Sequence, residues 1–278
     1  MKMQKKSWRI VIIMFLFLIV CTVLEAYGIK YDDITIRNHA QIAEKIRQGL
    51  IRRSENLTIT FRARTAKEDA IKRLVDDLLE EALTEGDEPY SRDYLRYQMG
   101  GYELHYEMEK KGFFYNYTAE LKPLYFTTRQ EEDYVDEQVA AILTNLNLSD
   151  RSVQEQIRCV HDYLIDQLSY DQVHKENENS HKKATAYAAL RYHRVSCQGY
   201  AVLCYRLLRE LGIPCRIVTG QLQTEDQNEY HAWVAVTIDG VEYYMDPTLD
   251  DQLSCDDWYM KTADEFDRDH KAEPMSQE

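Results

Sequence analysis

The sequence is poor in basic residues relative to acidic ones. Its 34 Lys and Arg stand against 48 Asp and Glu, which gives a net charge of −14. Nucleic-acid-binding proteins need clustered Lys and Arg for their phosphate contacts, so this imbalance argues against that class. It also argues against binding of the bulk of the chain to an anionic lipid surface. We therefore expect no nucleic-acid partner.

Glycine, proline and cysteine are also scarce, with 10, 5 and 6 residues in a chain of 278. So few Gly and Pro exclude a collagen-like chain or a Pro-rich linker architecture, and six Cys are too few for a disulfide-dense scaffold. Hydrophobic residues make up 44%, which is enough for a packed core and excludes global disorder. The length allows one large domain or two smaller ones.

The first hydrophobic run, Ile10–Leu24, carries no charge over fifteen residues. Basic residues at positions 2–9 precede it and acidic residues at positions 25–33 follow it, which predicts a cytoplasmic N-terminus and an exported remainder. A helix of this length rises roughly 22 Å, short of the roughly 30 Å hydrocarbon core, and so fits the h-region of a signal peptide. Ala26-Tyr27-Gly28 resembles a small-x-small cleavage site.

We therefore predict a signal peptide or, alternatively, a signal anchor at residues 1–29, and a protein that is held at the cell membrane or secreted. Membrane contact is expected through this segment only. Leu18-Ile19-Val20-Cys21 is a poor lipoprotein acylation site, because small residues are expected before the Cys. A buried core helix is a further alternative, but the run has no polar face.

Residues 30–128 combine helical and strand patterns and predict a small α+β region. Apolar residues recur at helical spacing at Ile42, Ile46 and Leu50, and again from Ala70 to Ala82, where Gly86 and Pro89 end the second helix. Leu57–Phe61 alternates between apolar and polar residues, as a strand does. Two further strand patterns, Tyr102–Met108 and Phe113–Phe126, flank the turn Lys110-Lys111-Gly112 and predict a hairpin. This region contains no catalytic constellation, and its aromatics are expected in the core and on the sheet surface.

Residues 129–278 are predicted to form the second domain. Helical stripes cover residues 135–146 and 153–168, the second entered through a capping box formed by Ser152 and Glu155. A helix is expected from about Gln198 to Leu211, where Gly212 and Pro214 end it. Strands are expected at 215–220, 230–238 and 241–246, with Asp239-Gly240 as a two-residue hairpin turn.

The two-residue turn predicts the register of the two strands that it joins. Ile238 then opposes Val241, and by extension His231 opposes Thr248 and Trp233 opposes Asp246. His231 and Asp246 therefore share a face as diagonal neighbours, roughly 7–8 Å apart at Cα. An Asp carboxylate at this distance can orient an imidazole and stabilise its cation.

Cys197 stands immediately before a helical pattern. The positive end of a helix dipole and the free N–H groups of its first turn favour a thiolate there, and the thiolate is the nucleophilic form. The same N–H groups can stabilise an oxyanion on an attacked carbonyl. Singly, a buried Cys, a His at a strand start and an Asp after a hairpin have structural explanations, but the combination favours acyl transfer through a thioester.

Four segments carry a resemblance to a known family: Ser196-Cys197-Gln198-Gly199-Tyr200-Ala201, Leu207 to Arg216, Tyr230-His231-Ala232-Trp233-Val234 and Tyr244-Met245-Asp246-Pro247-Thr248. They resemble the core of the transglutaminase-like superfamily, within the papain-like cysteine-protease fold group. The match is dense from Ala184 to Asp250 and weaker at His161-Asp162-Tyr163-Leu164 and Tyr170-Asp171. It implies an α+β fold in which a nucleophile-bearing helix packs on an antiparallel sheet, without a cofactor or metal.

The resemblance implies Cys197 as nucleophile, His231 as general base and acid, and Asp246 as its orienter. Active relatives attack an amide and form a thioester, which either water or an amine resolves. Hydrolysis of protein or cell-wall peptide amides outside the cytoplasm is our first expectation, because the sequence has no calcium-loop signature of the animal cross-linking enzymes, and amine transfer is the second. The alternative is a catalytically silent binding or scaffold module at the cell surface.

The remaining Cys and His residues are weaker candidates for a functional role. Cys204 and His161 are expected in the core, and Cys159, Cys215 and Cys255 could form a disulfide whose pairing the spacing does not show. His174, His181 and His193 lack metal-ligand spacing. The stretch from Glu265 to His270 is expected to be a solvated tail after the last strand.

Overall fold

The structure is a computed structural model, and it describes residues 34–35, 39–64, 67–84, 89–171, 180–224 and 228–273. The predicted signal peptide or anchor at 1–29 lies outside these residues, as does Gly86. None of the helices within the described ranges has both the length and the hydropathy that a membrane span requires.

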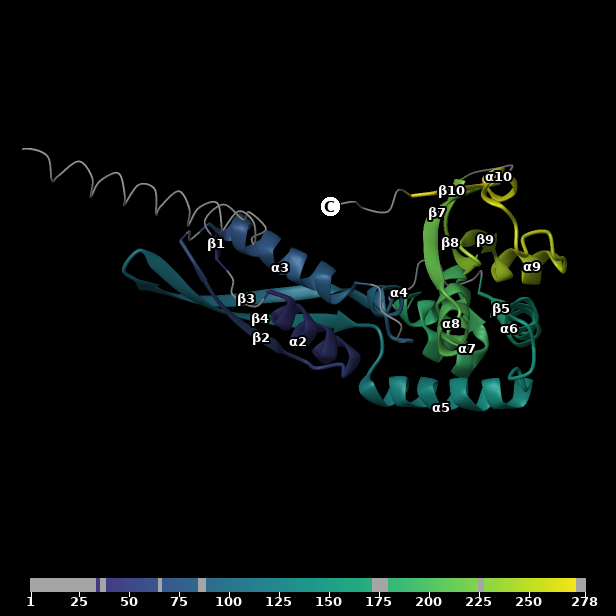
Figure 1. Cartoon of the computed structure of the whole chain (residues 1–278), viewed down its shortest axis with the longest axis horizontal. Coiled ribbons are helices and arrows are strands. Elements are labelled where there is room, and N and C mark those ends of the chain that lie inside the picture. The colour runs from purple at the N-terminus through teal and green to yellow at the C-terminus, as the bar shows by residue number, and fades with distance from the viewer. Residues whose placement is uncertain are drawn as a thin grey trace, which may run out of the picture.

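The first part of the chain is an antiparallel sheet with helices packed on one face (Figure 1). Its strands lie in the order β1-β2-β4-β3. The elements are β1 (Ile34–Thr35), α2 (His39–Ile51), β2 (Leu57–Ala63), α3 (Glu68–Ala82), α4 (Arg92–Arg96), β3 (Met99–Lys111) and β4 (Phe114–Tyr125). Alternate residues of β2 are buried against α2 and α3, because side chains of a strand point to opposite faces in turn.

The predicted elements of this region are confirmed, although β3 is longer than the predicted Tyr102–Met108 and β4 is one residue shorter at each end than the predicted Phe113–Phe126. The whole apolar stripe from Ala70 to Ala82 is buried on α3. Lys111 pairs with Phe114 across the turn, so the connection is the two residues Gly112-Phe113, whereas Lys110-Lys111-Gly112 was predicted. Gly112 has a φ of +65°, a conformation that glycine adopts at little cost.

The second part contains a four-stranded sheet in the order β10-β7-β8-β9, with helices around it (Figure 1). Its first elements are α5 (Arg129–Leu146), α6 (Val153–Gln167), β5 (Ser169–Tyr170), the 3-10 helix η1 (Ser180–Ala184), α7 (Ala186–Tyr192), β6 (Arg194–Val195) and α8 (Cys197–Glu210). They are followed by β7 (Cys215–Gln223), β8 (Asn228–Ile238), β9 (Val241–Met245), α9 (Pro247–Leu253), α10 (Ala263–Phe266) and β10 (His270–Ala272).

Helix α8 is the centre of this part. Its residues from Gly199 to Arg209 are all buried, and the hydrophobic ones form one core with residues of α5, α6, α7 and the sheet. Gly212, with a φ of +73°, follows the helix as predicted. The fold is therefore a mixture of helix and antiparallel sheet with α8 packed on the sheet, as the sequence predicted.

Buried polar contacts join the two parts of the chain. The Asp93 carboxylate of α4 accepts a hydrogen bond from the backbone N–H of Ile217 on β7, at 2.7 Å. Arg53 and Glu132 form a buried ion pair at 2.8 Å, and Tyr94 donates to the same Glu132 at 2.8 Å. Tyr94 also belongs to the core around α8 rather than to that of the first sheet. These contacts fix the first part against α5, α8 and β7.

Candidate active site

Cys197 is the first residue of α8 and is half-buried. Lys183 holds the start of the helix, since its carbonyl accepts a hydrogen bond from the backbone N–H of Ser196 at 3.1 Å. The chain passes so close here that a Cβ on Gly199 would lie 2.6 Å from the Cβ of Val195 and 2.7 Å from the Lys183 carbonyl oxygen. Only glycine fits at this position, and it lets the sulfur stand at the positive end of the helix.

The hairpin that carries His231 has the predicted turn and register. Asp239 and Gly240 have φ angles of 51° and 79°, and Ile238 pairs with Val241. The ladder ends, however, at Val234 and Met245. The predicted extension of this register, which would pair His231 with Thr248 and Trp233 with Asp246, is therefore wrong.

The physical reason is the helix that begins directly after the strand. Asp246 has φ −125° and ψ 87° and acts as the N-cap of α9, with Pro247 in the first turn. Proline has no N–H to donate to a ladder and its fixed φ suits the start of a helix. The return strand consequently ends at Met245 instead of Asp246.

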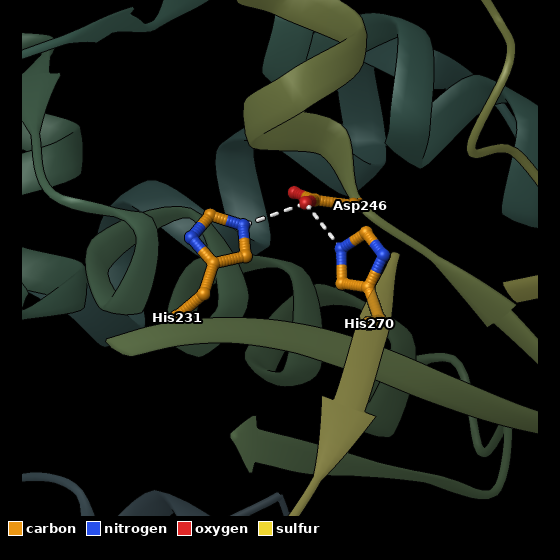
Figure 2. Close-up of side chains that lie close together, drawn as sticks. All are labelled: His231, Asp246 and His270. Carbon is orange, nitrogen blue, oxygen red and sulfur yellow. Dashed lines mark hydrogen bonds and ion pairs between the residues drawn. The ribbon is translucent and has the colours of Figure 1, made fainter. Parts of the chain in front are cut away.

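The early start of α9 brings Asp246 to His231. One carboxylate oxygen, Oδ2, lies 2.6 Å from Nε2 of His231 (Figure 2). The other, Oδ1, accepts the backbone N–H groups of Thr248 and Leu249 at 2.9 and 3.2 Å. Both side chains are buried, with 4% of His231 and none of Asp246 exposed.

Charge and hydrogen bonding set the protonation of this pair. Burial disfavours the charge on Asp246, but the charge of His231 and the hydrogen bonds of His231 and His270 hold the pKa of the carboxyl well below its usual range. Burial likewise opposes protonation of His231. The charge and hydrogen bond of Asp246, and then those of Cys197, outweigh it and raise the pKa of the imidazole from 6.5 to about 10.

The structure thus brings together the three residues that the sequence singled out. Cys197 lies close enough to the His231 ring to contribute to the raised pKa of its imidazole. Because Nε2 of that ring faces Asp246, the nitrogen left for the sulfur is Nδ1. An arrangement of this kind can supply a nucleophile, a proton carrier and a carboxylate that fixes the tautomer of the carrier.

The expectation of a solvated tail at Glu265 to His270 is wrong. His270 is fully buried on β10, which pairs antiparallel with β7. Its Nε2 lies 3.2 Å from Oδ2 of Asp246, the same oxygen that His231 contacts (Figure 2). The local sequence is charged and has no alternating pattern, so only the tertiary contacts of this short strand reveal the role of His270.

His231, Asp246 and His270 are also the one group of the described residues whose ligand atoms gather as in a metal site, within 4.8 Å of one another. Nε2 of His231 and Nε2 of His270 each already hydrogen-bond Oδ2 of Asp246. Of the histidines weighed from the sequence, His181 stacks on Phe126 with ring centroids 4.9 Å apart and His193 caps α7, while His174 lies outside the described residues.

The other predictions on single residues have clear outcomes. Cys204 is fully buried and His161 is buried with its Nε2 at 3.0 Å from Oδ2 of Asp250, as expected for core residues. Among the five cysteines in the described ranges the structure contains no disulfide, so none joins Cys159, Cys215 or Cys255.

Cys197 opens into a cleft of about 670 Å³. Residues of both parts of the chain line it. The first part contributes Arg96, Tyr97, Met99 and Phe126, and the second part contributes, among others, Tyr170, Gln198, Glu229 and Tyr230. Gln198, next to the sulfur-bearing residue, donates a hydrogen bond from its side chain to the carbonyl of Tyr97 at 2.9 Å.

Comparisons with known proteins find similarity over part of the chain. Residues 137–247 match the family described as the transglutaminase-like superfamily. A search of curated proteins finds no match.

Solved structures show weaker similarity. One is the crystal structure of a TGase, with 16% identity and a TM-score of 0.36; the match covers 52% of this chain and 44% of that one. Another is described as a candidate cysteine protease from Cytophaga hutchinsonii, with 15% identity and a TM-score of 0.35, covering 54% of this chain and 65% of the other. The chain thus spans less than two thirds of either relative. The segment 137–247 belongs to the transglutaminase-like superfamily.

Proposed function

We propose that the protein is a cysteine-dependent enzyme that acts on amide bonds of proteins or cell-wall peptides through a thioester intermediate. Cys197 is the nucleophile, His231 the acid and base, and Asp246 the group that orients His231. The observation that carries this proposal is the His231 ring itself, which bonds the buried Asp246 carboxylate through Nε2 at 2.6 Å and interacts with Cys197.

The resting state follows from the charges around His231. With a pKa of about 10, the imidazole is protonated at neutral pH and can form an ion pair with a Cys197 thiolate. The thiolate is the attacking species, and the first N–H groups of α8 lie beside it. The His231 imidazolium therefore holds the proton for the leaving group before substrate arrives.

In the first half of the reaction, the Cys197 sulfur attacks the amide carbonyl carbon and forms a C–S bond, while the carbonyl oxygen becomes an oxyanion. The backbone N–H groups at the start of α8 are placed to stabilise that charge. His231 then gives its Nδ1 proton to the amide nitrogen, the C–N bond breaks, and ammonia or an amine leaves. Neutral His231 and a thioester on Cys197 remain.

In the second half, His231 takes a proton from the incoming nucleophile, which attacks the thioester. The C–S bond breaks, the thiolate returns, and His231 is again protonated. Water gives a carboxylic acid and an amine gives a new amide. We favour hydrolysis, with amine transfer second.

The cleft indicates how the substrate is held. Its lining includes four aromatic side chains, those of Tyr97, Phe126, Tyr170 and Tyr230, which can pack against the side chains of a peptide. Two of them, Tyr97 and Phe126, belong to the first part of the chain. We therefore infer that the first part of the chain forms one wall of the substrate site, through its segment from Arg96 to Phe126.

The test is the reactivity of the thiols at neutral pH. We expect iodoacetamide to alkylate Cys197 faster than Cys159, Cys204, Cys215 or Cys255, because only Cys197 combines a helix start with the His231 imidazolium. Timed alkylation of the native protein followed by peptide mass spectrometry measures each rate. Burial raises the pKa of Cys204 above its usual range, so this thiol is the internal slow reference.

The His231→Ala variant serves as the matched control for this test. It removes the imidazolium and leaves the sulfur at the start of α8, so alkylation of Cys197 should slow while that of the other four cysteines stays unchanged. Equal rates at Cys197 and at these four other cysteines in the wild type would overturn the proposal. They would favour the alternative of a silent binding module.

We further propose that the enzyme acts outside the cytoplasm. The basic residues 2–9 followed by the uncharged run Ile10–Leu24 support this orientation. Protease added to intact cells should digest residues 30–278, as judged with an antibody against the C-terminal part. Complete protection, in cells whose exposed surface proteins are degraded, would contradict an exported domain.

A further inference from the structure

His270 is fully buried next to the candidate active site. Its ring packs against Phe266 and Trp233, with centroid distances of 4.0 and 4.9 Å. The backbone of β10 is brought close to β7 at Gly220, where a Cβ would lie 2.1 Å from the carbonyl oxygen of Lys271. A larger residue at Gly220 would force the strand that carries His270 away from the sheet.

Both ring nitrogens of His270 face carboxylates. Nδ1 lies 2.6 Å from Oδ1 of Asp269, and Nε2 lies 3.2 Å from Oδ2 of Asp246. An ionised carboxylate only accepts hydrogen bonds, so Nε2 of His270 is the donor in the contact with Asp246. Asp269 is itself fixed, because its second oxygen accepts the indole N–H of Trp258 at 3.0 Å.

Asp246 thereby accepts four hydrogen bonds. Thr248 and Leu249 donate to one oxygen, and His231 and His270 donate to the other. Two acceptor sites per oxygen are the capacity of a carboxylate, so the group can neither rotate nor tilt without losing a bond. The lone pair that faces His231 is consequently fixed by three other donors.

We propose that His270, oriented by Asp269, is a positioning residue that locks the Asp246 carboxylate in the orientation that His231 requires. This inference rests on the proposed function, since it concerns the same site. It extends the group from three residues to five, in the order Asp269, His270, Asp246, His231 and Cys197. It also gives the C-terminal strand β10 a part in the reaction.

The test compares His270→Leu with His270→Gln in the full chain, with the iodoacetamide rate of Cys197 as readout. Leucine has no donor, and we expect alkylation about tenfold or more slower, the effect of losing one hydrogen bond to a charged group. Glutamine keeps an N–H donor and should restore much of the rate. Asp269→Ala, a change at a partly exposed side chain that leaves the ring in place, should slow alkylation several-fold because His270 loses its second anchor.

The matched control is His161→Leu. His161 is also fully buried and bonded to a carboxylate, that of Asp250, but it does not contact Asp246. Since Asp250 lies on α9, this variant also shows whether disturbing that helix is enough to slow the alkylation of Cys197. We expect a loss of thermal stability comparable to that of His270→Leu, with the Cys197 rate close to wild type.

An unchanged rate in a folded His270→Leu, in a protein whose wild-type Cys197 is selectively alkylated, would overturn this inference alone. Equal slowing in His161→Leu, or no recovery in His270→Gln, would also overturn it and leave a structural role. A wild-type rate that changes on addition of EDTA would assign the cluster to a metal ion and overturn it as well. Unselective alkylation in the wild type would overturn the proposed function, and this inference with it.

Discussion

Replacing Cys197 with Ala should abolish turnover, with a loss on the order of 10⁶-fold, the size found when the nucleophile of a triad enzyme is removed. The variant should remain folded, because the side chain is half-buried at the first position of α8 and the core begins at Gly199. Turnover is measured by incubating residues 30–278 with cell-wall peptides and exported proteins and identifying the products by mass spectrometry.

Cys204→Ala is the matched control for this experiment. It removes a thiol seven positions further along the same helix, where the side chain is fully buried in the core. This change should lower the free energy of unfolding but leave turnover near the wild-type rate. Running both proteins with and without a primary amine separates an acid product from a new amide. A folded Cys197→Ala variant that still reacts at the wild-type rate would place the site elsewhere or leave binding as the function.

Local sequence patterns predict many elements of this fold. The stripe from Ala70 to Ala82 is long and periodic, so one face of α3 had to be buried. Ser152 and Glu155 form the predicted capping box, with each side chain bonded to the other residue's backbone N–H. The hairpin turn Asp239-Gly240 gave the correct register because its two residues adopt positive φ at low cost.

The predictions were wrong where a distant segment or a neighbouring element determines the local structure. Asp246 was predicted as the end of a strand, but Pro247 favours a helix start, and the Asp side chain satisfies two of the free N–H groups of that helix. The conclusion that Asp246 faces His231 was correct in outcome, although the continuous ladder on which it depended stops at Met245.

His270 had no local signal at all. A three-residue strand in a charged stretch is formed by its partner strand β7 and by the aromatic side chains around it, and not by its own propensity. The contribution of Tyr97 and Phe126 to the cleft likewise depends on how the two parts of the chain pack. Such long-range contacts depend on the packing of the whole core, which patterns in short segments do not predict.

The Asp246→Asn variant should keep its fold but lose turnover by orders of magnitude, up to about 10⁴-fold. Asparagine has one acceptor oxygen and one donor group, so it cannot accept all four hydrogen bonds that the carboxylate receives. Donors left unpaired in this buried site should each lower the free energy of unfolding by roughly 1–3 kcal/mol. Asparagine orients the histidine in some papain-like enzymes, so the loss is smaller than that of Cys197→Ala.

The same variant should change the pH dependence of Cys197 alkylation in a defined direction. The Asp246 charge is a main cause of the raised pKa of His231, about 10, so the imidazolium beside the sulfur persists up to that pH in the wild type. Removing the charge lowers this pKa, and His231 should then lose its proton at a lower pH. Alkylation rates from pH 5 to 11 should therefore show the upper transition moving downward in Asp246→Asn. The transition should stay in place in His161→Leu, and an identical profile in both variants and the wild type would show that Asp246 does not set the protonation of His231.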